Sequence, residues 1–390
     1  MSNNTQPEIR FPGFMEDWEQ RKLGEVSKIG DIDHRMPPSV DDGIPYLMTG
    51  DFIEENELNF ENTKLVSEDD YLQLSKKIRP EYGDILFARY ASVGAVRYVS
   101  THRKFLISYS CAIIKPFSDI DGQFLYPTLK TQKMQQKIEF EINPNSQKNI
   151  GIDSLKKLPL FIPKMDEQQK IGTFFKQLDD TIALHQRKLD LLKETKKGFL
   201  QKMFPKNGAK VPEIRFPGFT ENWEEKKFKE VINSGIKGKA KAEMSGTKSL
   251  YLDTNYLNGG VVTYVDSPRD VENDDVLILW DGSQAGTVYY GFSGALGSTL
   301  KAYRAKESGA FLYQQLKRNQ QIIYDRYRTP NIPHVVKTFT DEFMVSMPSS
   351  EEQNKIGAFF KQLDDTIALH QRKLDLLKET KKGFLQKMFV

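Results

Sequence analysis

The 390-residue sequence has a single cysteine, Cys111, and only five histidines. One thiol excludes an internal disulfide framework and predicts a reducing, cytoplasmic location. No apolar run approaches the ~18–20 residues of a membrane helix, so no membrane span is expected. The histidines lack the spacing to cysteines or carboxylates that is typical of a metal site; they are His34, His102, His185, His334 and His370.

Catalytic motifs are missing as well. There is no GxxxxGK[ST] phosphate loop, and no GxGxxG motif leads from a predicted strand into a helix. Asp274 and Asp275 precede a predicted strand, but no metal-binding motif accompanies them. Ser110 and Cys111 lie in an apolar run, which favours a place in the core over a nucleophile. The sequence therefore predicts a chain that is not an enzyme and binds no metal.

What the sequence does contain is a long repeat that is identical to the letter. The 31 residues FFKQLDDTIALHQRKLDLLKETKKGFLQKMF occur at 174–204 and again at 359–389. A short repeat precedes each of them, PEIRFPGFMEDWEQRK at 7–22 and PEIRFPGFTENWEEKK at 212–227. The blocks between short and long repeats are unlike each other. This layout predicts a two-unit tandem, which has too few units for a solenoid.

The long repeat has the periodicity of a helix with one apolar stripe. Apolar positions alternate three and four residues apart, which predicts a coiled-coil seam. The predicted seam residues are Phe175, Leu178, Ile182, His185, Leu189 and Leu192 in one copy, and Phe360, Leu363, Ile367, His370, Leu374 and Leu377 in the other. The seam extends through Lys196 and Lys381 and beyond Gly198 and Gly383, so each helix is expected to continue past its glycine.

A stripe about 45 Å long must be buried against something. The simplest partner for one copy is the other, because the same chain supplies both. We therefore expect an antiparallel intramolecular coiled coil with the variable blocks at opposite ends. Packing of each helix on its own block, or on a second chain, are the alternatives. His185 and His370 are expected to set the register of the seam rather than to bind a ligand.

The two variable blocks show the same order of predicted elements. Short β-rich runs come first, then a helical segment at 124–141 or 309–324, then a return strand that ends in proline. The pattern predicts an α+β fold with two α/β domains separated by two long helices. The expected boundaries are 1–165 for the first domain, 166–206 for the first helix, 207–350 for the second domain and 351–390 for the second helix.

Charge is distributed unevenly along the chain. Residues 301–337 carry eight Lys or Arg against two acidic residues, and Lys237, Lys239 and Lys241 form a second basic cluster. Residues 21–164 hold 20 basic and 20 acidic residues and are neutral. Such clusters are ordinarily solvated surface, yet basic loops interleaved with aromatic residues also suit a groove that holds DNA phosphates. Charge alone leaves both interpretations open.

Several motifs span the chain: FPGF with a following tryptophan, GDILF, WDGSQAGTVYYGFSGALGST, EQQKIG or EEQNKIG, and ALHQRKLDLLKETKKGFLQKMF. With these motifs the whole chain resembles the specificity subunit of a type I restriction-modification system. The resemblance implies a non-catalytic, pseudo-two-fold symmetric chain whose two target-recognition domains each read half of an asymmetric site in double-stranded DNA. It also implies two modification (methyltransferase) subunits and restriction (translocase-nuclease) subunits as partners. S-adenosylmethionine, ATP and Mg²⁺ are then expected on those partners, and no cofactor on this chain.

Polar and basic residues at strand ends and in loops are the candidates for DNA contacts. In the first block they are Arg35, Thr49, Arg89, Tyr90, Ser92, Gln147, Lys148 and Asn149. In the second block they are Lys237, Lys239, Lys241, Asp281, Ser283, Gln284, Ser298, Thr299, Arg328, Asn331 and His334. Arg89 is a prominent candidate because a bidentate contact from arginine to guanine is the commonest specific base contact.

Two other functions compete with this hypothesis. A stand-alone DNA-binding regulator with a coiled-coil dimer interface would bind DNA specifically without partners. An adaptor whose blocks bind proteins would show no salt-dependent affinity for DNA.

For a specificity subunit, two domains that approach one face of B-DNA predict half-sites ~10 bp apart, centre to centre. The unread gap between half-sites of ~3–5 bp is then roughly 5–7 bp.

Overall fold

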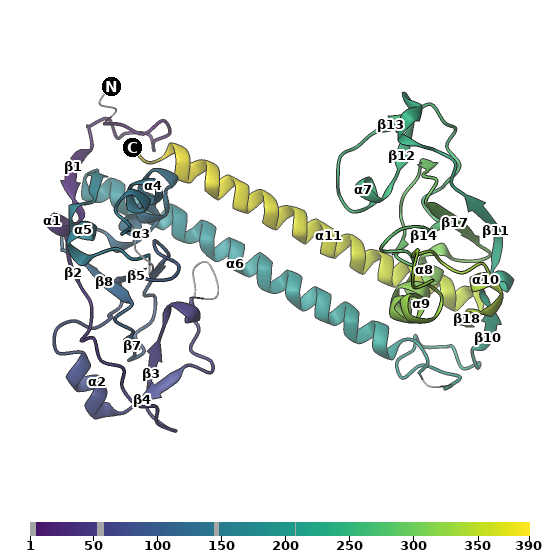
Figure 1. Cartoon of the computed structure of the whole chain (residues 1–390), viewed down its shortest axis with the longest axis horizontal. Helices are drawn as coiled ribbons and strands as arrows, with labels where there is room; N and C mark the ends of the chain where they lie inside the picture. The colour runs from purple at the N-terminus through teal and green to yellow at the C-terminus, as the bar shows by residue number, and fades with distance from the viewer. Residues whose placement is uncertain (1–4, 53–57, 144–147, 207) are drawn as a thin grey trace. The chain divides into compact units, whose positions relative to one another are not determined.

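The computed structural model describes residues 5–52, 58–143, 148–206 and 208–390. The chain divides into two compact units. Unit 1 consists of Met1–Gln186 together with Arg372–Val390, whereas unit 2 is the continuous segment Arg187–Gln371. Two helices of 38 residues, α6 (Met165–Lys202) and α11 (Ser350–Lys387), each contribute one part to each unit (Figure 1).

In unit 1 the described strands form sheets of order β2-β8-β5-β6, β4-β3-β7 and β1-β9. The strands are β1 (Glu19–Lys22), β2 (Ser27–Gly30), β3 (Ile44–Leu47), β4 (Lys64–Val66), β5 (Ile85–Ala88), β6 (Val96–Tyr98), β7 (Leu106–Ile107), β8 (Cys111–Pro116) and β9 (Pro159–Ile162). The shorter helices are α1 (Leu23–Val26), η1 (Thr49–Asp51), α2 (Glu68–Leu74), α3 (Gly122–Lys130), α4 (Gln132–Phe140) and α5 (Ile152–Lys157).

Unit 2 repeats this topology with sheets of order β11-β17-β14-β15, β13-β12-β16 and β10-β18. The strands are β10 (Glu224–Lys227), β11 (Ile232–Lys237), β12 (Ser245–Leu252), β13 (Tyr264–Val265), β14 (Val276–Leu279), β15 (Val288–Tyr289), β16 (Ala295–Leu296), β17 (Leu300–Ala305) and β18 (Met344–Met347). The shorter helices are η2 (Phe228–Glu230), η3 (Ala242–Met244), α7 (Thr254–Leu257), α8 (Gly309–Arg318), α9 (Gln320–Arg326) and α10 (Phe339–Glu342). The expected α+β fold is confirmed, and two unlike sequences adopt one strand order.

The helical segment expected in each block is divided in two. In the first block Thr131 has an extended backbone between α3 and α4, and its hydroxyl accepts a hydrogen bond from the Met134 amide. In the second block Asn319 separates α8 from α9. Threonine and asparagine compete with helical hydrogen bonding through their own side chains, which explains why the helix ends there.

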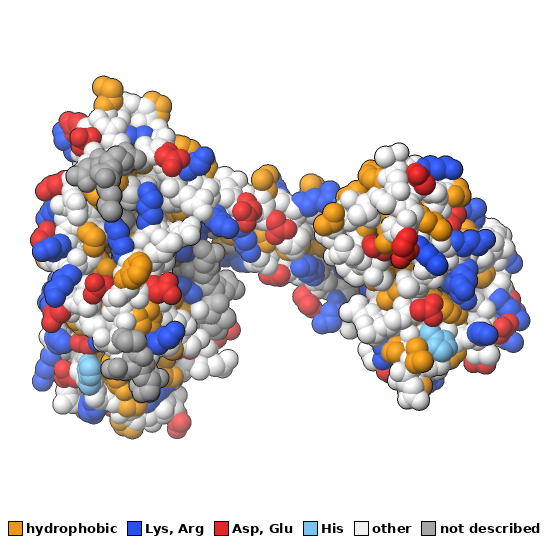
Figure 2. All heavy atoms as spheres, turned by 45° about the horizontal axis from the view of Figure 1, so that its top comes forward, with side chains coloured by type: hydrophobic (Ala, Val, Ile, Leu, Met, Phe, Trp, Pro, Cys, Tyr) orange, Lys and Arg blue, Asp and Glu red, His pale blue; other side chains and the backbone are white. Residues whose placement is uncertain are grey.

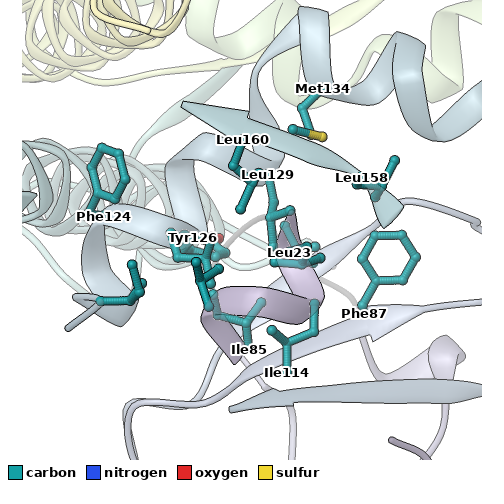
Figure 3. Close-up of a cluster of buried hydrophobic side chains, with 14 of the residues drawn as sticks. Leu23, Ile85, Phe87, Ile114, Phe124, Tyr126, Leu129, Met134, Leu158 and Leu160 are labelled. Carbon is teal, nitrogen blue, oxygen red and sulfur yellow. The ribbon is translucent and has the colours of Figure 1, made fainter. Parts of the chain in front are cut away.

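The core of unit 1 lies between the four-stranded sheet and helix α3. Ile85 and Ile114 are fully buried cross-strand partners on β5 and β8, and Leu129 of α3 is fully buried in the same cluster. Figure 3 shows side chains from these elements pointing toward one another. Burying an aliphatic side chain of this size stabilises the fold by about 1.5–3 kcal/mol.

An aromatic cluster fixes each block to the ends of the long helices. In unit 1 the Phe124 ring of α3 lies 5.7 Å from the Trp18 ring and 5.8 Å from the Phe389 ring. Phe389 in turn lies 5.6 Å from Phe175 of α6. The corresponding residues of unit 2 are Phe311, Trp223, Phe204 and Phe360. The two tryptophans belong to the short repeat, and the phenylalanines at the helix ends belong to the long repeat. Both repeats therefore contribute to the contact between each block and the long helices.

Each block packs so closely against its long helix that one helix position has no room for a side chain. A Cβ added to Gly172 would lie 2.9 Å from the backbone of α3, and one added to Gly357 would lie 2.9 Å from the Phe311 amide nitrogen. Glycine is therefore required at both positions, because the block approaches the helix backbone directly.

The two long helices run antiparallel within each unit. In unit 1, Phe175 of α6 contacts Phe389, and Asp179, one turn later, contacts Lys381 of α11. In unit 2 the same order holds between α6 and α11, through Lys196 with Asp364 and then Phe199 with Phe359. Both helices continue through their glycines, as expected.

The residues proposed for the seam all lie on the covered side of the helices. Phe175, Ile182, Leu189, Phe360 and Leu374 are buried. The others are half-buried: Leu178, His185, Leu192, Leu363, Ile367, His370 and Leu377. The register-setting role of the two histidines stays a prediction.

Candidate nucleic-acid interface

Polar side chains of unit 2 line an open hollow of about 530 Å³. The hollow lies where the loop after β14, the turn before β17 and helix α7 meet. Its polar lining consists of Thr254, Asn255, Asn258, Asp281, Ser283, Gln284 and Thr299. Four of these residues were predicted from the sequence as DNA contacts, and the structure brings them together: Asp281, Ser283, Gln284 and Thr299.

Backbone hydrogen bonds hold the loop after β14 in place. The amides of Trp280 and Asp281 donate to the Thr299 carbonyl at 2.8 and 3.1 Å. The Gly282 amide donates to the Pro333 carbonyl at 2.9 Å, and Gly282 has a φ of +122°, a conformation that favours glycine. The side chains of this loop are therefore presented from a fixed backbone.

The return segment brings further candidates to the same edge. His334 forms a β-bridge with Asp281, and its Nδ1 lies 3.0 Å from the Thr329 hydroxyl. The Arg328 guanidinium donates to the Ser283 carbonyl at 3.2 Å. Asn331 is exposed in this segment.

Lysine residues lie along one side of the hollow. Lys237 and Lys301 are cross-strand partners on β11 and β17, and the Lys301 ammonium lies 3.3 Å from the centre of the Trp280 ring. Burial and the neighbouring Lys237 charge lower the pKa of Lys301. Lys237, Lys239 and Lys241 are exposed, and the Ser298 amide donates to the Ala240 carbonyl within this cluster. Lysine and arginine side chains also lie on the face of unit 2 seen in Figure 2.

Unit 1 builds the same frame with different side chains. The Arg89 amide donates to the Ser110 carbonyl at 2.9 Å, as the Trp280 amide does to Thr299 in unit 2. Arg89 and Tyr90 thus occupy the positions of Trp280 and Asp281. Tyr90 forms a β-bridge with Asn149, matching the bridge of Asp281 with His334.

The Arg89 side chain points into the protein rather than toward solvent. Arg89 is 6% exposed, its guanidinium forms an ion pair with Asp31, and its Nε donates to the Ile150 carbonyl at 3.0 Å. Asp31 also binds Lys77 at 2.8 Å and His34 at 3.0 Å. In this arrangement Arg89 ties the loop after β5 to Asp31 and Ile150, and its side-chain donors point into the protein.

The other candidates of the first block are spread over several segments. Ser92 and Lys148 are exposed, and Thr49 is half-buried at the start of η1. Arg35 is exposed and donates to Asp70 at 2.7 Å, beside α2. Gln147 lies outside the described residues.

Sequence reasoning missed several residues close to the loops that follow β5 and β14. Asn255 and Asn258 enter the hollow from α7 and the loop after it, and Asp253 caps α7 by accepting from the Tyr256 amide at 2.8 Å. In unit 1 the missed residues are His34 and Tyr109, whose rings stack 4.9 Å apart. These residues follow different strands, β12 in unit 2 and β2 and β7 in unit 1, so no shared sequence signal marked them.

Two kinds of feature are absent from the described part of the chain. No group of three or more His, Cys, Asp or Glu residues is arranged to hold a metal ion. None of the described helices combines the length and apolar character needed to cross a membrane.

Comparison with known families decides the assignment. Residues 15–194 and 220–379 match the model of the type I restriction modification DNA specificity domain. The chain belongs to this family. Membership confirms the resemblance noted in the sequence and makes the protein a specificity subunit, the non-catalytic component of a type I enzyme.

Individual relatives agree with the assignment. The specificity subunit is 30% identical over 195 residues to that of the MjaVIII type I restriction enzyme of Methanocaldococcus jannaschii, an alignment that spans 47% of this chain and 44% of the relative. It is 24% identical over 406 residues to the putative MjaX specificity subunit of the same organism, across 95% of this chain and 92% of the relative. The solved S subunit of a type I restriction-modification system from M. genitalium has the same fold, with a TM-score of 0.73 at 18% identity over 99% of each chain.

Proposed function

We propose that the two variable blocks read the two halves of a split, asymmetric DNA site, one half per block. The observation that supports this is the shared backbone frame with unlike side chains. The same strand order and the same amide-to-carbonyl link present Arg89 and Tyr90 in unit 1, but Trp280 and Asp281 in unit 2. A common frame gives both blocks one way of docking on DNA, and different side chains let them read different bases.

Within each block the contacts divide by chemistry. In unit 2 the side chains of the hollow face base edges, whereas Lys237, Lys239, Lys241 and Arg328 on its border neutralise phosphates. Ser298, Asn331 and His334 complete the border. In unit 1 the contacting side chains are Tyr90, Ser92, Lys148 and Asn149, on the loop after β5 and on the segment that pairs with it, with Arg35 and Thr49 on other segments; Gln147, outside the described residues, stays a candidate from the sequence alone. Arg89 supports this loop from below.

The long helices give one kind of modification subunit two equivalent docking surfaces. On α6, Leu184 and Leu191 are 59% and 67% exposed and lie two turns apart. On α11 the identical positions Leu369 and Leu376 are 63% and 67% exposed. Because the exposed leucines stand at the same positions of both copies, a subunit that recognises one pair can recognise the other. S-adenosylmethionine then belongs to the modification subunits, and ATP and Mg²⁺ to the restriction subunits.

Exchange of one block tests the proposal. Residues 23–164 are replaced by the equivalent block of another family member, the chain is assembled with its modification subunits, and methylated positions are mapped across a genome. We expect one half of the recognised site to change and the other half to stay the same. A change in both halves would show that the blocks do not read independently.

A further inference from the structure

We infer that Asp281 determines specificity in the half-site of unit 2, by accepting a hydrogen bond from the exocyclic amine of a cytosine or adenine. This inference rests on the proposed function, because it requires the polar hollow of unit 2 to face DNA.

The Asp281 carboxylate accepts no hydrogen bond from the described part of the protein, although its charge opposes the lowering of the Lys301 pKa. Asp281 is exposed and lines the hollow. In the part of the chain that the structure describes, its carboxylate forms no ion pair and accepts no hydrogen bond. The other carboxylates of this region are used: Asp253 caps α7 and Asp270 accepts from the Leu296 amide. Asp281 is therefore available for an external donor.

A carboxylate lowers the affinity of a surface for DNA phosphates, because both groups are negatively charged. Lys237, Lys239 and Lys241 make the border of the hollow attractive to the DNA backbone, whereas Asp281 repels it. The negative charge weakens binding unless a donor on the DNA compensates it. Base edges are the only source of such donors in the major groove.

The acceptor-only chemistry of the carboxylate selects among the bases. In the major groove, cytosine presents its N4 amine and adenine its N6 amine, both donors. Guanine presents the acceptors O6 and N7, and thymine presents O4 and a methyl group. Asp281 therefore admits cytosine or adenine and rejects guanine and thymine. Tyr90, at the same position in unit 1, carries a hydroxyl that both donates and accepts, so the first half-site has no equivalent restriction from this position.

The backbone around Asp281 is fixed well enough to make this selection. Its amide donates to Thr299 at 3.1 Å, it forms a β-bridge with His334, and the next amide donates to Pro333 at 2.9 Å. Specific recognition needs contacting groups that are held in place by their surroundings. The three backbone contacts at and next to Asp281 hold its backbone in this way.

Two substitutions with a matched control test the inference in the assembled enzyme. Asp281→Ala removes the acceptor, and Asp281→Asn keeps the shape but adds a donor. Asp341→Asn is the control, because Asp341 is an exposed carboxylate paired with Lys229 at 2.7 Å, next to the end of β11 remote from Lys237. Methylated sites are mapped for each variant, and block exchange establishes which half-site belongs to unit 2. Binding to duplexes with each of the four bases at the affected position is then compared.

The wild-type enzyme should require cytosine or adenine at one position of the unit 2 half-site. Asp281→Ala should lower discrimination against guanine and thymine at that position alone, by roughly 5- to 150-fold. Asp281→Asn should admit an acceptor-bearing base there, and Asp341→Asn should leave the site unchanged. Unchanged discrimination in both Asp281 variants would overturn the inference while the block assignment stands. If block exchange moves neither half-site, the proposed function itself fails.

Discussion

The ammonium group of Lys381 lies 2.7 Å from the Asp179 carboxylate, and the two side chains are only 6% and 13% exposed. The same pair occurs in reverse in unit 2, where Lys196 lies 2.5 Å from Asp364. Because the 31-residue repeat is identical in the two helices, one lysine and one aspartate of the repeat meet twice in the antiparallel arrangement. A shift in register would break both pairs, so these residues specify how the helices align.

Loss of one partner of the buried pair should destabilise the protein. Lys381→Met leaves the Asp179 carboxylate buried without a counter-charge, and we expect a loss of about 3 kcal/mol in the free energy of unfolding. Lys196→Met should cost less, because Lys196 and Asp364 are 17% and 33% exposed. Urea denaturation of the two variants measures the difference.

A double variant separates charge from packing at the same place. Lys381→Met with Asp179→Leu replaces the pair by apolar side chains and should recover most of the lost stability. Equal losses in the single variants Lys381→Met and Lys196→Met, with no recovery in the double variant, would contradict a buried pair of this kind.

The long helices could be predicted almost residue by residue, and their partner carboxylates could not. Periodicity identified the stripe and marked Lys196 and Lys381 as its polar interruptions, because a 3.5-residue repeat depends only on local sequence. Which carboxylate faces each lysine depends on the register of two distant segments. Asp179 and Asp364 therefore became visible only in the structure.

The stability of unit 1 should depend on pH through Asp31. Burial opposes its ionisation, but hydrogen bonds from Lys77 and His34 and the charge of Arg89 outweigh it and lower the pKa to about 2. A carboxyl whose folded pKa is depressed stabilises the protein above its unfolded pKa, ~3.9. That contribution is lost as pH falls from about 4 toward 2.

Thermal unfolding between pH 2 and pH 7 measures this dependence. Asp31→Asn should lower the melting temperature of the variant at neutral pH, and its difference from wild type should shrink as pH approaches 2. Asp153→Asn is the control, because the Asp153 side chain is 89% exposed and its pair with Lys156 contributes little. A constant difference across the whole range would show that the Asp31 charge is not responsible.

The surroundings of Arg89 could not be predicted from the sequence, and its contact with guanine stays an untested prediction. Its position at the end of a buried strand, next to a glycine-containing turn, suggested a side chain that reads guanine. The structure places it against Asp31, 58 residues away, an interaction between β5 and the end of β2 that local sequence does not encode. The succession of strands, turn and helix along each block was predictable from pattern, whereas the direction of the Arg89 side chain depends on a carboxylate from a distant segment.

The length of the long helices should set the distance between the half-sites. Seven residues inserted after Arg187 in α6 and after Arg372 in α11 preserve the seam, because the insertion is one heptad. Each helix lengthens by ~10 Å, so the unread gap should grow by about three base pairs at ~3.4 Å each. Mapping of methylated sites checks the gap. An unchanged gap in an active enzyme would mean that the helices do not set this distance.

The exposed leucines of the helices should bind the modification subunits. Leu184→Glu and Leu369→Glu place a charge at equivalent positions of the two copies, and each should reduce the number of modification subunits retained on purification. The double variant should retain none, while DNA binding by the chain stays intact. Thr181→Glu, a change at an exposed position on the same helix, is the matched control. Normal assembly of the double variant would place the docking surface elsewhere.

Duplication of one block tests the central claim most directly. Residues 23–164 are replaced by a second copy of residues 228–349, so that identical blocks stand on identical helices, and the methylated sites of a strain carrying this chain are mapped. If each block reads one half-site and the helices only hold the blocks, the recognised site should consist of two inverted copies of the unit 2 half-site around the unread gap. A methylated site that stays asymmetric, or that keeps the half-site of the removed block, would contradict the account.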